Sequence, residues 1–259
     1  MITMNQRFKS SLHFAKGLLF TAAFSISLFA CRTAEVAVNN QLKTETETYQ
    51  VKGRQGFQIG QVLSFGDYTT SKVKRGWTFS YSLPFIVKFN GAREKISFQQ
   101  FGLNGASADV ALVSRFKETE YEPLEDYFSI SLKYKNYFAG TVKVAESDES
   151  WDFLVHNVDG ASRSLGKNST VGFVRTNRTK IEIEGIRELE GSSSFLTQND
   201  VYGYQFTLDG KVVAAVSTIN NGKVWFKKDL DSNLKLVLAS VSSGLMLRNN
   251  MEDNAISMN

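Results

Sequence analysis

The chain has 259 residues, with 30 Lys and Arg against 26 Asp and Glu, two histidines and a single cysteine, Cys31. Residues 1–30 carry three of these bases and no acid, so residues 31–259 are nearly neutral, with 27 bases against 26 acids. A domain that binds nucleic acid is expected to be basic, so composition excludes that class. One cysteine also excludes an internal disulfide, and the core alone must stabilise the fold.

The first predicted element is a secretory signal. Arg7, Lys9 and Lys16 precede an uncharged, mostly apolar run of 14 residues, GLLFTAAFSISLFA, over residues 17–30. A basic segment followed by a short apolar run and a small residue is typical of a signal peptide. The run is shorter than the roughly 20 residues that span a bilayer as a helix. We therefore predict a signal peptide over residues 1–30.

The apolar run ends Leu28-Phe29-Ala30-Cys31, which resembles the lipobox of bacterial lipoproteins. The resemblance implies that the Cys31 sulfur receives a diacylglyceryl group, that cleavage follows Ala30, and that the new N-terminus is acylated, with palmitate as a typical chain. Phe29 departs from the family pattern, where this position is more often small. A free or buried thiol, or half of an intermolecular disulfide, is the alternative for Cys31.

Lipidation places the protein in the cell envelope, with the membrane as its partner through the anchor on Cys31. Arg32 follows the cysteine, where an Asp often retains family members in the inner membrane, so both the outer membrane and the periplasmic face of the inner membrane stay open. Residues 31–49 are rich in Thr, Glu and Asn and lack aromatic residues until Tyr49. This composition predicts a flexible tether, followed by a single β-rich domain over residues 50–259.

Turn dipeptides separate short apolar and β-branched runs throughout the predicted domain. They are Asn90-Gly91, Asp159-Gly160, Asp209-Gly210 and Asn221-Gly222. Such pairs favour tight hairpins because glycine adopts positive φ readily. The last two flank Val212–Thr218 and predict a three-stranded meander. We expect a mainly β fold, an antiparallel barrel or sandwich of about 10–12 strands.

The C-terminal region breaks the strand pattern. Leu234, Val237, Leu238, Val241 and Leu245 recur at helical spacing, and the other faces of residues 233–247 are apolar or carry small serines. A helix that is apolar on most sides must be buried on most sides. We therefore predict a buried apolar C-terminal helix. A pair of buried strands, LKLVLAS and GLMLR, is the alternative.

Residues 204–246 resemble the C-terminal half of tubby-like domains of the LURP-one and scramblase group. The resemblance implies a twelve-stranded barrel threaded by an apolar C-terminal helix. Besides the helix, it is carried by Asp209, Gly210, Val212, Val216, Trp225 and Phe226.

Residues able to carry out catalysis are few. His156 is the only histidine after the signal peptide and lies in a predicted strand, WDFLVHNV, where a structural role is expected. A zinc site would need several His or Cys ligands, so no metal or other cofactor is predicted. Carboxylates gather at Glu118, Glu120, Glu122, Glu125 and Asp126, and again at Asp148 and Glu149. A solvated face is the expected role for these acids, and we assign no catalytic residue.

The basic run SKVKRG, residues 71–76, places Lys72 and Lys74 on one face of an extended segment and Arg75 on the other. It suits either an exposed strand edge or contact with an anionic ligand. We expect a membrane-anchored lipoprotein with a non-enzymatic binding or structural domain. The alternatives are a secreted carbohydrate-active hydrolase that uses paired carboxylates, and a barrel that holds lipid in place of the helix.

Overall fold

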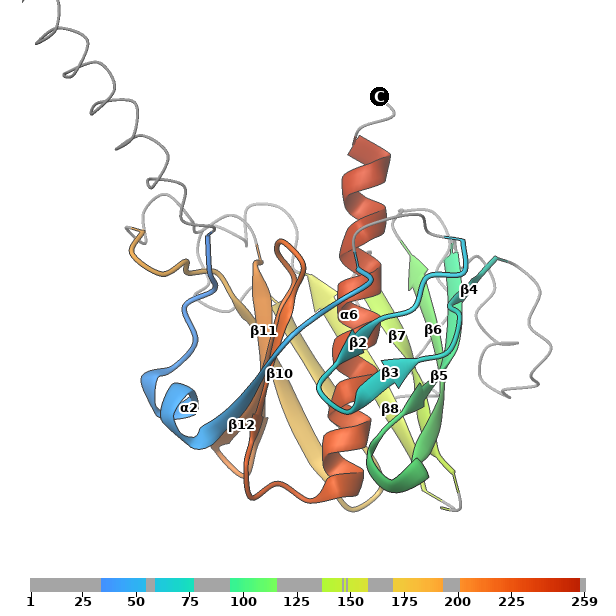
Figure 1. Cartoon of the computed structure of the whole chain (residues 1–259), viewed down its shortest axis with the longest axis horizontal. Helices are drawn as coiled ribbons and strands as arrows, with labels where there is room; N and C mark the ends of the chain where they lie inside the picture. Colours follow the sequence, from blue (N-terminus) through green and yellow to red (C-terminus); the bar gives the residue numbers. More distant parts are fainter. Residues whose placement is uncertain are drawn as a thin grey trace, which may run out of the picture. The chain divides into compact units, whose positions relative to one another are not determined.

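Antiparallel strands form a nearly closed barrel around the C-terminal helix in the computed structural model (Figure 1). The structure describes residues 34–54, 59–76, 94–115, 137–145, 147, 149–157, 170–192 and 201–256. The compact unit runs from Glu35 to Asn259. The predicted mainly β class and antiparallel barrel are confirmed.

The described residues form 13 strands in one sheet, 12 of them along a continuous path in the order β1-β13-β12-β11-β10-β9-β8-β7-β6-β5-β3-β2, with β4 paired to β5. The strands of the N-terminal half are β1 Thr46–Gln50, β2 Ser64–Phe65, β3 Tyr68–Thr70, β4 Lys74–Arg75, β5 Glu94–Phe101 and β6 Ser107–Arg115. Those of the C-terminal half are β7 Tyr137–Val144, β8 Ser150–Asn157, β9 Thr170–Arg175, β10 Lys180–Ile186, β11 Gly203–Leu208, β12 Lys211–Ser217 and β13 Lys223–Lys227. The helical elements are α2 Asn40–Glu45, the 3₁₀ turn η2 Leu103–Gly105, and α6 Ser232–Ile256.

The two ends of the sheet meet next to β1 and β2. Lys52 and Ser64 exchange two backbone hydrogen bonds, with N···O distances of 2.8 and 3.1 Å. These bonds connect the two edges of the sheet. A barrel that closes in this way leaves fewer backbone groups unpaired at open edges.

The predicted meander is confirmed as strands β11, β12 and β13. Asp209 and Gly210 have φ values of 49° and 74°, the two positive values that a type I′ turn needs. The turn that follows β12 also uses positive φ, at Asn220 and Gly222. Local turn chemistry therefore sets the register of this part of the barrel.

Helix α6 fills the interior of the barrel, as the sequence predicts, and the alternative of two strands is wrong. Its side chains from Leu236 to Arg248 are buried on all sides. Asp231 caps the helix through Oδ1, which accepts hydrogen bonds from the backbone N–H groups of Asn233 and Leu234 at 2.9 and 3.1 Å.

Small residues let α6 approach the sheet closely. A Cβ on Gly244 would lie 2.6 Å from Cδ1 of Leu112 in β6. The Ser243 hydroxyl donates a hydrogen bond to Oε1 of the buried Gln100 at 2.8 Å, and the Ser240 hydroxyl donates to the Leu236 carbonyl at 2.8 Å. Ser240 and Ser243 thus satisfy their own polar groups inside an apolar core, whereas the buried Ser242 hydroxyl has no hydrogen-bond partner among the described residues.

The predicted tether over residues 31–49 is wrong from Glu35 onward. Thr46–Gln50 forms strand β1 and pairs with β13, and α2 precedes it. Val36, Val38 and Leu42 are buried against Trp225, on the outer side of the barrel. Burial of these three apolar side chains helps to hold a polar segment on the sheet, because the sheet supplies the apolar partner that composition does not reveal.

Several sequence predictions lie outside the described residues. They include the signal peptide over residues 1–30, the lipobox with Cys31, and the turns at Asn90-Gly91 and Asp159-Gly160. The boundary of the folded domain moves from residue 50 to Glu35.

Candidate functional site

The described interior of the barrel is filled by protein side chains, most of them apolar. The core that surrounds α6 includes Phe65, Phe138, Phe153, Phe206 and Phe226 from the strands. Helix α6 contacts strands β3, β5, β6, β7 and β12. A lipid-handling barrel would need this volume for its ligand, so the described interior does not support that alternative. Functional groups must be sought on the outer surface and at the two ends.

The outer face of β7, β8 and β9 carries the histidine that the sequence analysis singled out. Phe153 and Val155 belong to the inner core, so alternation along β8 places Asp152, Leu154 and His156 on the outer face. Leu154 lies opposite Ala139 and Phe173 and is buried with them. This row of apolar side chains separates Asp152 from His156.

A row of polar residues crosses the same three strands beside the apolar row. Asp152 pairs in register with Thr141 on one side and with Arg175 on the other. The Arg175 guanidinium carbon lies 4.8 Å from the centroid of the Phe173 ring, a cation–π contact. The Thr141 hydroxyl is buried and has no hydrogen-bond partner among the described residues. The sequence could not show this row because it joins residues far apart in the chain.

Burial perturbs both titratable groups of this outer face. Burial raises the pKa of Asp152, and the positive charge of Arg175 opposes that rise. Burial lowers the pKa of His156 and so favours the neutral imidazole. These are shifts of the kind found at binding and catalytic sites, although structural groups show them too.

The predicted carboxylate clusters are only partly visible. Glu118, Glu120, Glu122, Glu125 and Asp126 lie outside the described residues, as does Asp148. Glu149 is exposed, and its backbone N–H donates a hydrogen bond to the Ser147 hydroxyl at 3.1 Å. Within the described strands, Asp152 faces an arginine rather than a second carboxylate.

A second polar cluster lies where α6 begins, and the sequence analysis missed it. The Lys235 side chain is only 11% exposed, and its Nζ donates hydrogen bonds to Glu47 Oε2 at 3.3 Å and to the Lys228 carbonyl at 3.0 Å. The Tyr49 hydroxyl donates to the same Glu47 oxygen at 3.0 Å. This hydrogen bond from Tyr49, assisted by Lys235, lowers the pKa of Glu47 against the opposing effect of burial. Burial, followed by the Glu47 carboxylate, raises the pKa of Tyr49 to about 12.

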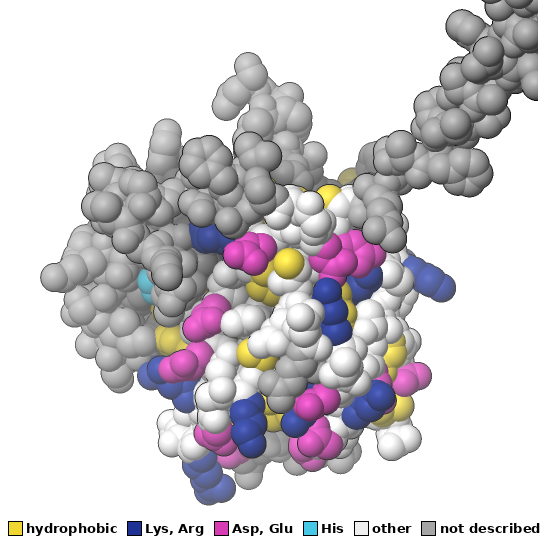
Figure 2. All heavy atoms as spheres, turned by 90° about the vertical axis from the view of Figure 1, so that its left-hand side faces the viewer, with side chains coloured by type: hydrophobic (Ala, Val, Ile, Leu, Met, Phe, Trp, Pro, Cys, Tyr) yellow, Lys and Arg dark blue, Asp and Glu magenta, His cyan; other side chains and the backbone are white. Residues whose placement is uncertain are grey.

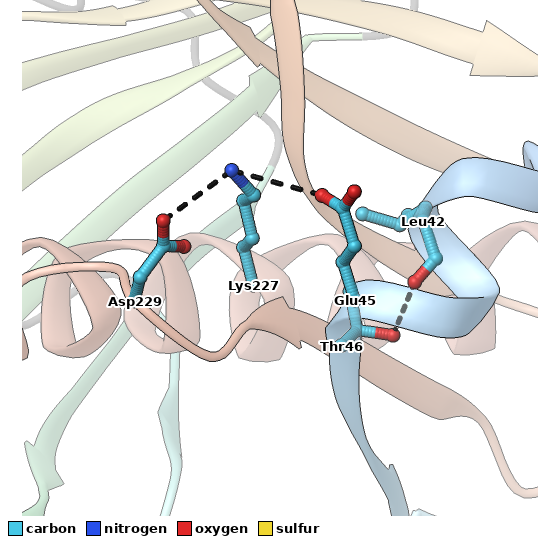
Figure 3. Close-up of polar contacts among 5 residues, drawn as sticks. All are labelled: Leu42, Glu45, Thr46, Lys227 and Asp229. Carbon is cyan, nitrogen blue, oxygen red and sulfur yellow. Dashed lines mark hydrogen bonds and ion pairs between the residues drawn. The ribbon is translucent and has the colours of Figure 1, made fainter.

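A charged seam continues this cluster on the outside of the barrel. Figure 3 shows the Lys227 ammonium between two carboxylates, at 3.7 Å from Glu45 and 3.4 Å from Asp229. The same view shows the Thr46 hydroxyl donating a hydrogen bond to the Leu42 carbonyl at 2.6 Å. These contacts join the end of α2 to β1 and β13, which is a structural role.

Charge on the face that carries α2 is mixed. Figure 2 shows Lys and Arg side chains interspersed with Asp and Glu over this surface. Ion pairs such as Lys223 with Glu35, 2.8 Å apart, and Lys43 with Glu190 account for part of that pattern. A surface of mixed sign produces no extended attractive field.

The basic run 71–76 lies at the opposite end of the barrel from Lys235. Lys72 and Lys74 are exposed, while Val73 is buried and Arg75 is half-buried, as the predicted alternation requires. Arg75 Nη2 donates a hydrogen bond to Gln61 Oε1 at 3.2 Å, and Gln61 Nε2 donates to the Arg54 carbonyl at 2.8 Å. Arg75 therefore supports the fold, and Lys72 and Lys74 are exposed at the surface.

Arg54 holds the exit of α6 from the barrel. Its guanidinium donates hydrogen bonds to the carbonyls of Asn220 and Thr218, both at 2.6 Å, and to that of Met246 in α6 at 3.4 Å. The side chain is almost fully buried. It links the β12–β13 turn to the helix.

No metal centre or membrane-spanning helix can be assigned to the described part of the chain. It holds no group of three or more His, Cys, Asp and Glu side chains placed to bind a metal ion. Among its helices, none is both long enough and apolar enough to cross a bilayer.

Comparisons with the family models, the curated proteins and the solved structures returned no match to this chain. The barrel with a C-terminal helix inside is the architecture that the resemblance to tubby-like domains implies. Membership of that group and of the lipobox lipoproteins stays a prediction.

Proposed function

We propose that this protein is a lipid-anchored protein of the bacterial cell envelope whose barrel serves as a non-enzymatic binding or structural module. Its anchor is the lipid on Cys31, and its working surface is the outside of the barrel. The observation that carries the second part is the packed interior: α6 occupies the space in which a barrel would otherwise hold a ligand. The signal-like segment and Cys31 carry the first part.

The anchor is tested by examining the N-terminus of the protein purified from membranes. Mass spectrometry should find an N-terminal peptide that begins at Cys31 and carries diacylglyceryl and acyl groups. Cys31→Ser or globomycin treatment should leave the longer precursor. Phe29→Ala is the matched control, because it keeps the cysteine and places a small residue before Ala30. A mature chain that begins elsewhere and carries no lipid contradicts the proposal.

A second candidate function, a hydrolase acting through carboxylates, is favoured by one observation. Burial raises the pKa of Asp152, and a carboxyl group with a raised pKa is what a general acid requires. If Asp152 has this role, glycosidase activity on chromogenic substrates should be measurable and should fall at least about 100-fold in Asp152→Asn. Glu149→Gln, an exposed neighbour, is the control and should keep the activity.

A further inference from the structure

The segment between Cys31 and the folded barrel is shorter than the predicted tether, which limits the distance between the barrel and the membrane. This inference rests on the proposed lipidation of Cys31. With a tether over residues 31–49, the domain could lie up to about 65 Å from the lipid, at roughly 3.3–3.6 Å per extended residue. The compact unit instead begins at Glu35, so the Cα atoms of Cys31 and Glu35 are at most about 14 Å apart. The anchor therefore holds one particular side of the barrel at the bilayer.

Contacts of Glu35 identify that side. The Glu35 carboxylate pairs with Lys223, the first residue of β13, at 2.8 Å. Lys223 follows the β12–β13 turn, and the Gly222 carbonyl of this turn accepts a hydrogen bond from the Val51 N–H at 3.1 Å. The chain thus joins the barrel at the end where Arg54 holds the exit of α6, as Figure 1 also shows. We call it the exit end.

The exit end carries a corner where apolar and basic side chains are exposed together. Ile59 is 84% exposed and Val62 is 39% exposed. The side chain of Lys72 passes 4.0 Å from the Cβ position of Gly60, and the Val73 N–H donates a hydrogen bond to the Gln61 carbonyl at 2.8 Å. Val62 also lies against Gly53, next to the exposed Lys52. We call Lys52, Ile59, Val62, Lys72 and Lys74 the basic corner.

The composition of the basic corner matches one kind of partner. Apolar side chains flanked by lysines are typical of protein surfaces that lie in the headgroup region of a bilayer. Lysines close to an anionic leaflet strengthen such binding. The mixed charge on the face that carries α2 offers no comparable attraction. Although Phe101 and Leu103 are also exposed, they lie at the opposite end, next to Leu236 near the start of α6.

We propose that the basic corner docks on the anionic surface of the membrane that carries the Cys31 anchor. Ile59 and Val62 then enter the headgroup region, and Lys52, Lys72 and Lys74 contact lipid phosphates. The lipid anchor on Cys31 and the basic corner together fix the orientation of the barrel relative to the bilayer. In this orientation the outer face of β7–β9, which carries Asp152 and His156, does not face the bilayer.

Because Cys31 is the only cysteine, a lipidated chain has no free thiol. A single cysteine introduced by substitution can therefore be labelled selectively. The full-length Ile59→Cys variant, purified from membranes, is labelled with an environment-sensitive fluorophore and reconstituted into phosphatidylcholine vesicles with or without phosphatidylglycerol. We expect a blue shift of emission and a gain of intensity at position 59 when phosphatidylglycerol is present. Leu103→Cys is the matched control, since Leu103 is 42% exposed at the opposite end, and should show neither change.

Reversing two charges tests the lysines directly. In the Ile59→Cys background, Lys72→Glu with Lys74→Glu should abolish the response to phosphatidylglycerol. Equal emission at positions 59 and 103 in these vesicles, with one label per chain, overturns the docking and leaves the anchor intact. Two labels per chain would show that Cys31 is a free thiol, which overturns the proposed function and the docking with it.

Discussion

The two ends of the barrel hold helix α6 by different chemistry. Where the helix begins, Lys235 reaches the carboxylate of Glu47, which also accepts a hydrogen bond from Tyr49. Where the helix leaves, the guanidinium of Arg54 donates to three backbone carbonyls. The first end depends on ionisable partners that are partly exposed, whereas the second pairs a permanent charge with neutral backbone oxygens. The beginning of the helix should therefore respond to pH, and the exit end should not.

The largest effect is expected at the exit end. Arg54→Met removes hydrogen bonds to three carbonyls, two of them in buried surroundings, which should lower the free energy of unfolding by about 3 kcal/mol. Urea titration followed by tryptophan fluorescence measures the loss. Lys52→Met, an exposed change two residues away, is the control and should cost no more than about 0.5 kcal/mol. Equal losses in the two variants would contradict the role of Arg54.

A smaller loss is expected where α6 begins. Lys235→Met removes two hydrogen bonds but keeps an apolar stem of similar length, so the free energy of unfolding should fall by about 1 kcal/mol. Lys228→Met, exposed and nearby, is the control and should be nearly neutral. If Lys235→Met proves as damaging as Arg54→Met, the two ends of the barrel contribute equally to holding α6, which contradicts the expected difference.

The Glu47 cluster should contribute to the pH dependence of stability at both acid and alkaline pH. Tyr49 has a pKa of about 12 in the folded chain, against about 10 when unfolded, so stability is lost as the pH rises from about 10 to 12. Tyr68, with a pKa raised to about 12 by burial, adds to this loss. Glu47 has a lowered pKa, so its contribution is lost as the pH falls from the ordinary value of 4.5 through the lower pKa of the folded chain.

Tyr49→Phe sharpens this prediction. The variant should lose less stability than the parent between pH 10 and pH 12 (a range set by the tyrosine pKa values), because one of the two phenols whose pKa is raised no longer ionises on unfolding. Chemical denaturation at several pH values measures the slope. An unchanged alkaline slope would show that the phenol does not govern it. Arg54→Met is the complementary control and should shift the whole profile without changing its slope.

The smallest effect is expected in the charged seam of Figure 3. Glu45→Gln removes one of the two partners of Lys227, both of them surface carboxylates. Exposed ion pairs contribute little, so the cost should be no more than about 0.5 kcal/mol and should vanish at high salt. A loss that persists at high salt would contradict a purely electrostatic origin.

Much of the fold followed from local patterns. The spacing of Leu234, Val237, Leu238, Val241 and Leu245 predicted α6, because a helix that is apolar on most sides must be buried. Asp209-Gly210 predicted a tight turn and supplies the two positive φ values that it needs. Both are statements about residues close together in the chain, for which short-range physics is decisive.

Only part of the candidate site could be predicted from the sequence. His156 stood out as the only histidine of the domain, but nothing in the sequence joined Asp152 to Arg175 or Lys235 to Glu47. Those pairs form across strands or between a strand and the helix, so they depend on the register of the sheet. The same holds for Arg54, whose three acceptors lie more than 160 residues away in sequence.

The sequence by itself determined the β-rich class, the buried helix and the turns of the last three strands. Only the tertiary structure decided that residues 35–49 belong to the barrel. Their composition is that of a flexible segment, and Val36, Val38 and Leu42 become a folding signal only when the outer side of β12 and β13 is present to bury them. That burial brings the folded domain to within four residues of Cys31 and turns a long tether into a short one.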